Sequence, residues 1–253
     1  MTEPLGVRSI GELPAVGPAA LCMGVFDGVH RGHRALTELT RHAAAERGLA
    51  SVALLFEPPP VEVMRPGHRL ARLATPEENL RRLAGAGVDV PIGLHFDEAV
   101  RMLPPDAFLA ALAPPIELRV LVMTSDSAFG YRRAGTAASM AAHAREAGFE
   151  LLLLDPLVEA AGGVVSSSRA RQLIAQGDLA GAEALVGAPA YLAGTVDGDG
   201  VLALDYVAAL PPSGAYVAQR RGGGEVRLRV DGAAVRVAGA PPGPAELDLL
   251  GPA

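Results

Sequence analysis

The sequence predicts an α/β fold in which a doubly wound parallel sheet is followed by a small antiparallel β domain. From residue 19 to about 185, short apolar runs alternate with longer helical segments, which is typical of a parallel sheet covered on both faces. After Pro189 the helical period ends, and strand-like runs follow, separated by Asp-Gly, Gly-Gly-Gly and Pro-Pro turns. We therefore expect one domain over residues 1–188 and a second over residues 189–253.

Five runs in the first domain are short and nearly all apolar, as strands buried on both faces are. The expected strands are residues 20–26, 50–56, 88–94, 118–123 and 150–154. The expected helices are residues 32–47, 75–86, 137–147, 168–176 and 179–186. Pro76 marks a helix start, and Gly148 marks a helix stop.

Six short strand-like runs make up the second domain, among them residues 201–207, 215–220, 225–230 and 233–238. Short runs joined by tight turns predict antiparallel pairing. They are consistent with a minimal barrel or with an appendage packed on the first domain.

The composition excludes several kinds of chemistry. All 22 basic residues are arginine, so no lysine can serve as a Schiff base, a general base or a P-loop cation. The net charge of −6 argues against nonspecific nucleic-acid binding, which needs a basic face. The single cysteine, Cys22, lies in an apolar run and excludes an intrachain disulfide and a cysteine zinc site.

The sequence also bears on location. A lone apolar cysteine fits a reducing compartment. No basic-then-apolar leader opens the chain, and no apolar stretch reaches the length of about 18 residues that a membrane span requires. We therefore expect a cytoplasmic protein without a membrane partner, and the sequence leaves protein partners unknown.

The sharpest motif lies where the first strand gives way to the first helix. His30 and His33 are three positions apart on the opening turn of that helix, where free N–H groups attract phosphate. Its glycines allow the backbone to approach a ligand. The motif's other candidate residues are Gly24, Phe26, Asp27, Gly28 and Gly32. Such a site suits nucleotidyl transfer, which needs positioning and charge neutralisation. The alternatives are two helix-capping histidines or a zinc site lacking a third clear ligand.

A second motif precedes the helix expected at residues 168–176. Ser166, Ser167 and Ser168 are suited to capping a helix, and capping alone is one interpretation. With Arg169 and Arg171 added, the same helix start becomes a candidate cradle for a polyphosphate, because guanidinium groups bind phosphate oxygens in a bidentate way. Catalysis would then come from stabilising the departing pyrophosphate.

Two further motifs follow strands at the expected ligand edge of the sheet. After residues 118–123 come Asp126, a candidate acceptor for ribose or base donors or a group that helps to order magnesium, and Phe129 and Arg133. After residues 50–56 comes a stiff loop, in which Phe56, Pro58 and Pro60 suit a planar ring ligand. Ordinary surface charge and a simple loop terminator are the alternatives.

Together, in this order, the four motifs resemble the bacterial bifunctional riboflavin kinase and FAD synthetase family over about residues 15–195. The stretch 24–33 is similar to that family's Gly-x-Phe-Asp-Gly-x-His-x-Gly-His signature, 56–60 to its Phe-x-Pro-His-Pro loop, 126–135 to its Asp-Phe-x-Phe-Gly-x-x-Arg-x-Gly segment, and 165–171 to its Ile-Ser-Ser-Thr-x-Ile-Arg. The resemblance implies a Rossmann-like HxGH nucleotidyltransferase fold, and an FMN adenylyltransferase that makes FAD and pyrophosphate from FMN and ATP.

The resemblance also implies residue roles. His30, His33 and Arg171 would be catalytic. ATP would be bound by Gly24, Phe26, Asp27, Gly28, Gly32, Asp126, Ser166, Ser167 and Ser168. The flavin would be bordered by Phe56, Pro58, Pro60, Phe129 and Arg133. Mg²⁺ would be held through the phosphates, with no direct protein ligand expected.

Several positions depart from the family pattern. Pro59 replaces histidine, Thr124 glycine, Ser127 phenylalanine and Ser168 threonine. The first three concern the flavin pocket, so transfer to another phosphorylated acceptor and a noncatalytic flavin- or nucleotide-binding role remain alternatives. No Gly-x-Pro-Thr-Ala-Asn phosphate loop follows Tyr191, although residues 211–217 are similar to the kinase module's Pro-x-x-Gly-Val-Tyr strand. We therefore expect a contracted kinase-like barrel without riboflavin kinase activity.

Overall fold

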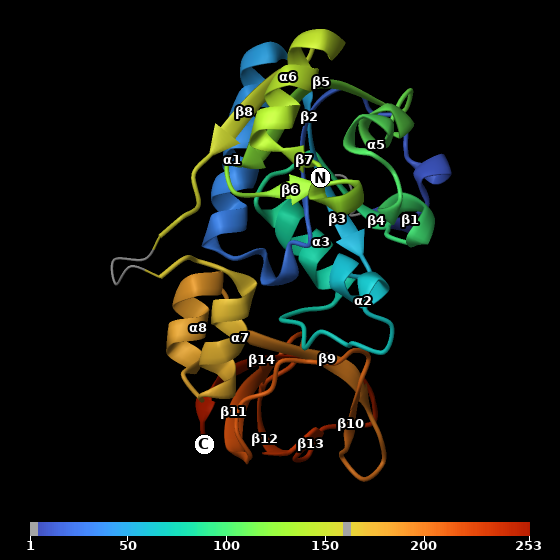
Figure 1. Ribbon diagram of the computed structural model, residues 1–253. Helices are drawn as coiled ribbons and strands as arrows, with labels where there is room; N and C mark the ends of the chain where they lie inside the picture. Colours follow the sequence, from blue (N-terminus) through green and yellow to red (C-terminus); the bar gives the residue numbers. More distant parts are fainter. Residues whose placement is uncertain (1–4, 159–162) are drawn as a thin grey trace. The chain divides into compact units, whose positions relative to one another are not determined.

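A computed structural model describes residues 5–158 and 163–253 (Figure 1). The described residues pack into two compact units. The first unit contains residues 5–68 and 76–158, and the second contains residues 69–75 and 163–253. No helix in these described ranges is long and apolar enough to cross a membrane.

The first unit is built on a six-stranded sheet in which every neighbouring pair of strands is parallel. Its order is β1-β4-β3-β2-β5-β8. The strands are β1 (Leu5–Arg8), β2 (Gly17–Gly24), β3 (Ala50–Glu57), β4 (Val90–His95), β5 (Ile116–Thr124) and β8 (Glu150–Leu154). From β2 the chain winds outward to β3 and β4, and then returns past β2 to β5 and β8. The predicted doubly wound parallel sheet is confirmed.

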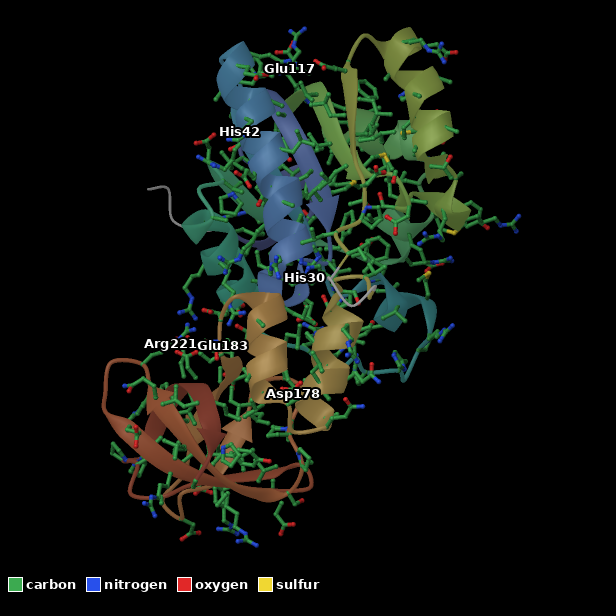
Figure 2. The ribbon with its side chains drawn as sticks, turned by 90° about the vertical axis from the view of Figure 1, so that its left-hand side faces the viewer. His30, His42, Glu117, Asp178, Glu183 and Arg221 are labelled. Carbon is green, nitrogen blue, oxygen red and sulfur yellow. The ribbon has the colours of Figure 1, made fainter. Side chains whose placement is uncertain are left out.

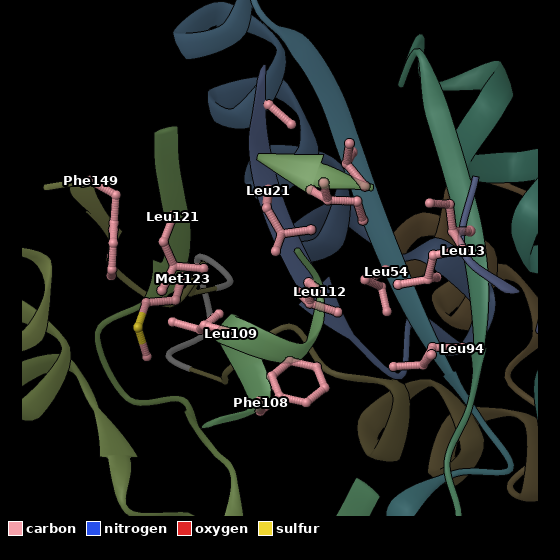
Figure 3. Close-up of a cluster of buried hydrophobic side chains, with 14 of the residues drawn as sticks. Leu13, Leu21, Leu54, Leu94, Phe108, Leu109, Leu112, Leu121, Met123 and Phe149 are labelled. Carbon is pink, nitrogen blue, oxygen red and sulfur yellow. The ribbon is translucent and has the colours of Figure 1, made fainter. Parts of the chain in front are cut away.

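Helices cover both faces of this sheet. On one face, α1 (Arg31–Arg47) and α3 (Pro76–Gly85) contribute Leu36, Leu80 and Leu83 to a core that also contains Cys22. On the other face, α5 (Pro105–Ala111) and the helix α6 (Ala137–Ala147) pack against the alternate strand residues. Figure 3 shows the second core, with Leu21, Leu54 and Leu121 from the strands beside Phe108 and Leu109. Successive strand residues point to opposite faces, so a continuous apolar run supplies both cores.

Shorter elements connect these layers. They are the helices α2 (Pro60–Met64) and α4 (Glu98–Arg101), the 3₁₀ turns η1 (Ile10–Glu12), η2 (Asp27–Val29) and η3 (Tyr131–Arg133), and a hairpin of β6 (Ala128–Phe129) and β7 (Gly135–Thr136). The edge strand β1 and the helices α2, α4 and α5 were not predicted. β1 pairs with β4 at Gly93, where a β-carbon would lie 3.0 Å from the Cα of Val7.

The second unit contains a six-stranded antiparallel sheet of order β10-β9-β14-β11-β12-β13. The strands are β9 (Ala190–Val196), β10 (Leu202–Leu204), β11 (Gly214–Arg220), β12 (Glu225–Asp231), β13 (Ala234–Val237) and β14 (Gly243–Pro252). A bridge between Val201 and Arg236, and a 2.8 Å bond from the Val237 N–H to the Gly200 carbonyl, join the two outermost strands. The sheet is therefore barrel-like, as in the first of the two predicted arrangements, the minimal barrel.

Two helices belong to the second unit as well. They are α7 (Ser167–Ala175) and α8 (Leu179–Val186), and α8 contacts β9 and β14. Packing thus groups these helices with the antiparallel sheet, whereas the change from helical to strand-like sequence comes just before β9. The expected boundary between residues 188 and 189 stays a prediction.

Candidate functional site

Three of the four predicted motifs lie at one edge of the parallel sheet. The winding of the chain reverses between β2 and β5, and ligands of open α/β sheets bind outside the carboxyl ends of the strands at such a switch point. β2 ends at Gly24 and leads to His30, β5 ends at Thr124 and leads to Asp126, and β3 ends at Glu57 before the proline loop. Strand order alone therefore brings these motifs to the same edge.

The turn from β2 into α1 has an unusual backbone. Phe26 (φ 50°), Gly28 (φ 76°) and Val29 (φ 48°) all adopt left-handed conformations. Glycine tolerates such a φ, but a bulky or β-branched residue is strained there. All residues from Phe26 to His30 are buried. Strain of this kind persists only where the surrounding structure fixes it, and it is concentrated at functional sites.

His30 and His33 form a tightly coupled pair at the start of α1. His30 is the N-cap, and its Nδ1 accepts a hydrogen bond from the backbone N–H of His33 at 3.3 Å. The two rings are stacked, with centroids 3.6 Å apart and planes 16° apart. Because Nδ1 is the acceptor, a neutral His30 has its hydrogen on Nε2, which leaves Nε2–H as a donor. Figure 2 shows His30 at the beginning of α1 and His42 farther along the same helix.

The surroundings of His33 favour a neutral ring. Burial, and then the nearby His30, lower the pKa of His33 well below its ordinary value of 6.5. Its Nδ1 is buried without a hydrogen-bond partner among the described residues. Two stacked imidazoles also resist being charged together. The site therefore presents a neutral His33 ring and the Nε2 donor of His30 beside the N–H groups at the start of a long helix, which suits an anionic ligand.

Phe26 and Asp27, both predicted to contact ATP, are among the least accessible residues of the site. The ring of Phe26 is fully buried and meets His33 edge to face, with centroids 5.1 Å apart. Asp27 is 3% exposed. The buried ring of Phe26 thus packs against the imidazole of His33 and helps to hold it in place.

The segment after β5 forms the β6–β7 hairpin. Asp126 is exposed at its start, next to Ser125, whose hydroxyl donates to Asp155 at 2.8 Å. Arg132 and Arg133 are exposed and left-handed (φ 54° and 58°). The guanidinium group of Arg132 lies 5.2 Å from the centre of the Tyr131 ring.

A row of aromatic rings connects the two predicted flavin-binding segments. The ring centroids of Phe56 and Phe108 are 6.0 Å apart, and so are those of Phe108 and Phe129. Both pairs have edge-to-face geometry. Phe56 also meets Phe96 at 5.4 Å. Pro60 is the first residue of α2, while Pro58 precedes it in the loop. The sequence did not single out Phe108, because the helix that bears it was not predicted.

The serine motif opens α7 in the second unit. The hydroxyl of Ser166 accepts from the backbone N–H of Arg169 at 3.2 Å, so this serine is the helix cap. Arg171 donates from Nη2 to the hydroxyl of Ser168 at 3.1 Å. The motif thus places a guanidinium group and hydroxyls at one helix start. Its predicted meeting with His30 and His33 around a single triphosphate stays a prediction.

No group of three or more His, Cys, Asp or Glu residues suited to holding a metal occurs among residues 5–158 and 163–253.

A parallel sheet of this order, with an HxGH segment at its switch point, defines an α/β nucleotidyltransferase-type domain. Residues 14–169 match the family model described as FAD synthetase, and the chain belongs to that family.

Known proteins agree with this placement. The chain is 35% identical over 193 residues to a bifunctional riboflavin kinase/FMN adenylyltransferase from Escherichia coli K12, covering 76% of this chain and 61% of the relative. A putative protein of the same description from Geobacillus thermodenitrificans is 32% identical over 171 residues, which cover 68% of this chain and 90% of that protein. The chain thus spans about three fifths of the length of the E. coli relative.

A solved structure shows the same fold over the whole chain. It is the crystal structure of a protein described as a macrolide-efflux protein from Streptococcus pneumoniae, with a TM-score of 0.83 at 22% identity. The similarity covers 100% of this chain and 91% of that one. At this identity the likeness concerns the fold alone.

Proposed function

We propose that the protein is an FMN adenylyltransferase, which transfers AMP from ATP to FMN and releases pyrophosphate. The observation that supports this most directly is the stacked pair of His30 and His33 at the start of α1, at the switch point of the parallel sheet. The chain that forms this sheet belongs to the FAD synthetase family. A pair of imidazoles at a helix N-terminus is suited to binding polyphosphate.

The reaction forms one P–O bond and breaks another. A phosphate oxygen of FMN attacks the α-phosphorus of ATP, and the bond from that phosphorus to the bridging oxygen breaks, so the electron pair leaves with pyrophosphate. The Nε2–H of His30 and the first N–H groups of α1 donate to phosphate oxygens where negative charge increases. Because burial keeps the His33 ring neutral by lowering its pKa, this site acts mainly by hydrogen bonding and positioning.

Arg171 and the serines of α7 are proposed for the pyrophosphate side. The guanidinium group already shares a hydrogen bond with Ser168, which keeps it at the helix start. The side-chain hydroxyl of Ser166 already caps α7. A contact between this hydroxyl and phosphate would therefore be additional to its role as the cap. A guanidinium group fits the oxygens of a departing pyrophosphate.

Magnesium would supply charge neutralisation on the phosphates. The residues present fit an ion held mainly by substrate oxygens, because Mg²⁺ typically takes one or two carboxylates plus phosphates rather than a full protein cage. Among the predicted site residues, the carboxylates at this edge of the sheet are Asp27, which is buried, and Asp126, which is exposed.

The flavin is assigned to the aromatic side of the site. Phe56 and Phe129 belong to the row of rings described above, and Arg133 is an exposed cation four residues after Phe129. Pro58 and Pro60 stiffen the loop between β3 and α2. We further propose that residues 189–253 form a domain without riboflavin kinase activity, and that the enzyme works in the cytoplasm on small molecules, with no nucleic-acid partner.

The test is direct. Purified protein is incubated with FMN, ATP and Mg²⁺, and the products are separated by chromatography, with riboflavin replacing FMN in a parallel reaction. We expect FAD and pyrophosphate from FMN, and no FMN from riboflavin. Pyrophosphate release only with another phosphorylated acceptor would reassign the substrate, and binding of both ligands without any turnover would remove the enzymatic assignment.

A further inference from the structure

The strained turn that precedes α1 is held by side chains of α3. The backbone N–H of Gly28 donates to Oδ1 of Asn79 at 2.9 Å, and Nη1 of Arg82 donates to the carbonyl oxygen of Gly28 at 3.0 Å. Both backbone polar groups of one turn residue are therefore bonded by one helix, more than fifty positions farther along the chain.

The two side chains are themselves fixed. Asn79 is 5% exposed, and Nε of Arg82 donates to Oε1 of Glu78 at 2.7 Å. The side chains of Arg82 and Glu78 are only 8% and 4% exposed. Separating a buried, hydrogen-bonded ion pair costs much free energy, because each charge would be left in the interior without its partner. α3 thus offers Gly28 a rigid acceptor, Asn79, and a rigid donor, Arg82. We call these two hydrogen bonds to Gly28 the clamp.

The turn needs such support at this position. Gly28 lies between Phe26 and Val29, the two residues whose side chains disfavour the left-handed backbone that they adopt. The next residue, His30, caps α1 and stacks on His33. A relaxation of the turn would move His30, since only one residue separates it from Gly28. Displacements of about 1 Å at a site can reduce rates about a hundredfold.

We propose that Asn79 and Arg82 are positioning residues of the adenylyl-transfer site, which act on the reaction through Gly28 and thereby through His30. This inference rests on the proposed function and names part of the machinery behind it. Neither side chain needs to touch substrate, and their effect is on where the imidazole donors lie when charge develops.

Four variants test the proposal kinetically. Asn79→Leu keeps the volume and removes the acceptor, whereas Asn79→Asp keeps an acceptor oxygen. Arg82→Gln is matched with Arg81→Gln, because both arginines pair with Glu78 and the contact to Gly28 is made by Arg82. We expect Asn79→Leu and Arg82→Gln to lower kcat for FAD formation about tenfold or more, with little change in KM for FMN.

In the same assay Asn79→Asp should recover most of the rate, and Arg81→Gln should resemble the wild type. Equal losses in Arg81→Gln and Arg82→Gln, or an unchanged kcat in Asn79→Leu, would overturn the proposal. Thermal melts establish that each variant is folded, and Arg82→Gln tests the carbonyl half of the clamp independently if Asn79→Leu does not fold.

A second measurement does not depend on activity. Hydrogen exchange at the Gly28 amide, followed by NMR, should be about tenfold faster in Asn79→Leu than in the wild type, and unchanged in Arg81→Gln. If wild-type protein makes no FAD, the proposed function fails while the exchange still reports on the clamp. If FAD forms but neither kcat nor exchange responds to Asn79→Leu, the clamp alone is wrong.

Discussion

Gly130 and Pro105 are packed so closely that a β-carbon at Gly130 would lie 2.8 Å from the Cγ of Pro105. Gly130 also has a φ of 71°, and it leads from Phe129 into the left-handed pair Arg132 and Arg133. The hairpin after β5 is therefore fitted to the first turn of α5. This contact fixes the predicted flavin-side residue Phe129 against the fold.

A first prediction follows from that contact. Gly130→Ala should lower the free energy of unfolding by about 1–3 kcal/mol, because it adds both steric overlap and left-handed strain. Gly222→Ala is the matched control, since Gly222 has the same φ of 71° but no atom within 4 Å of its added carbon. Urea denaturation measures both. If the two variants lose equal stability, the backbone angle and not the packing is responsible.

His30→Asn separates capping from chemistry. Asparagine is a favourable N-cap, so α1 should still begin at Arg31, and the melting temperature should stay close to that of the wild type. The Nε2–H donor is lost, and removal of one such donor typically lowers kcat about 10²–10³-fold. FAD formation under saturating ATP and FMN measures this loss. Retention of the full rate would exclude His30 from the phosphates.

The lowered pKa of His33 predicts a pH dependence of stability. The unfolded chain takes up a proton at this residue near its ordinary pKa of 6.5, while the folded protein does so only at lower pH. Unfolding thus binds a proton, so the stabilisation is fully present above pH 6.5 and is lost as pH falls below it, by at most about 1.4 kcal/mol per pH unit.

Urea denaturation between pH 7.5 and 5, for the wild type and for His33→Gln, checks the sign. The variant removes this titration, so its stability should fall less steeply with decreasing pH. A variant whose slope equals that of the wild type would show that other groups set the acid sensitivity.

Phe129→Leu tests the aromatic row. Leucine keeps an apolar side chain but loses the edge-to-face contact with Phe108, and it removes the proposed ring surface for the flavin. We expect KM for FMN to rise about tenfold, while KM for ATP changes little. Steady-state kinetics with each substrate varied in turn will distinguish this from a general loss of the site, which would raise both constants.

Periodicity predicted the regular elements closely. Residues 137–147 and 179–186 are helices with those bounds, and residues 150–154 are a strand. Apolar runs and terminal signals decide such elements locally. By contrast, α5 was missed because Pro104 and Pro105 look like a loop, although proline at the first helical position costs no hydrogen bond.

The site was predictable in part, for a similar reason. The histidine pair could be placed on a helix start from spacing and glycines alone. The first strand, however, was expected to reach Phe26, and it ends at Gly24 because Phe26 turns left-handed. Nothing near Asn79 marks it as a partner of Gly28, since a contact between distant segments depends on the folded sheet.

The place of β14 in the antiparallel sheet affects the order in which this chain acquires its structure. β14 pairs with β9 on one side and with β11 on the other. While the ribosome is still extending the polypeptide, those two strands lack the strand that lies between them, and the second unit cannot close before residues 243–252 have emerged. Its assembly therefore waits for β14, whereas the parallel sheet has all its strands once residue 154 is available.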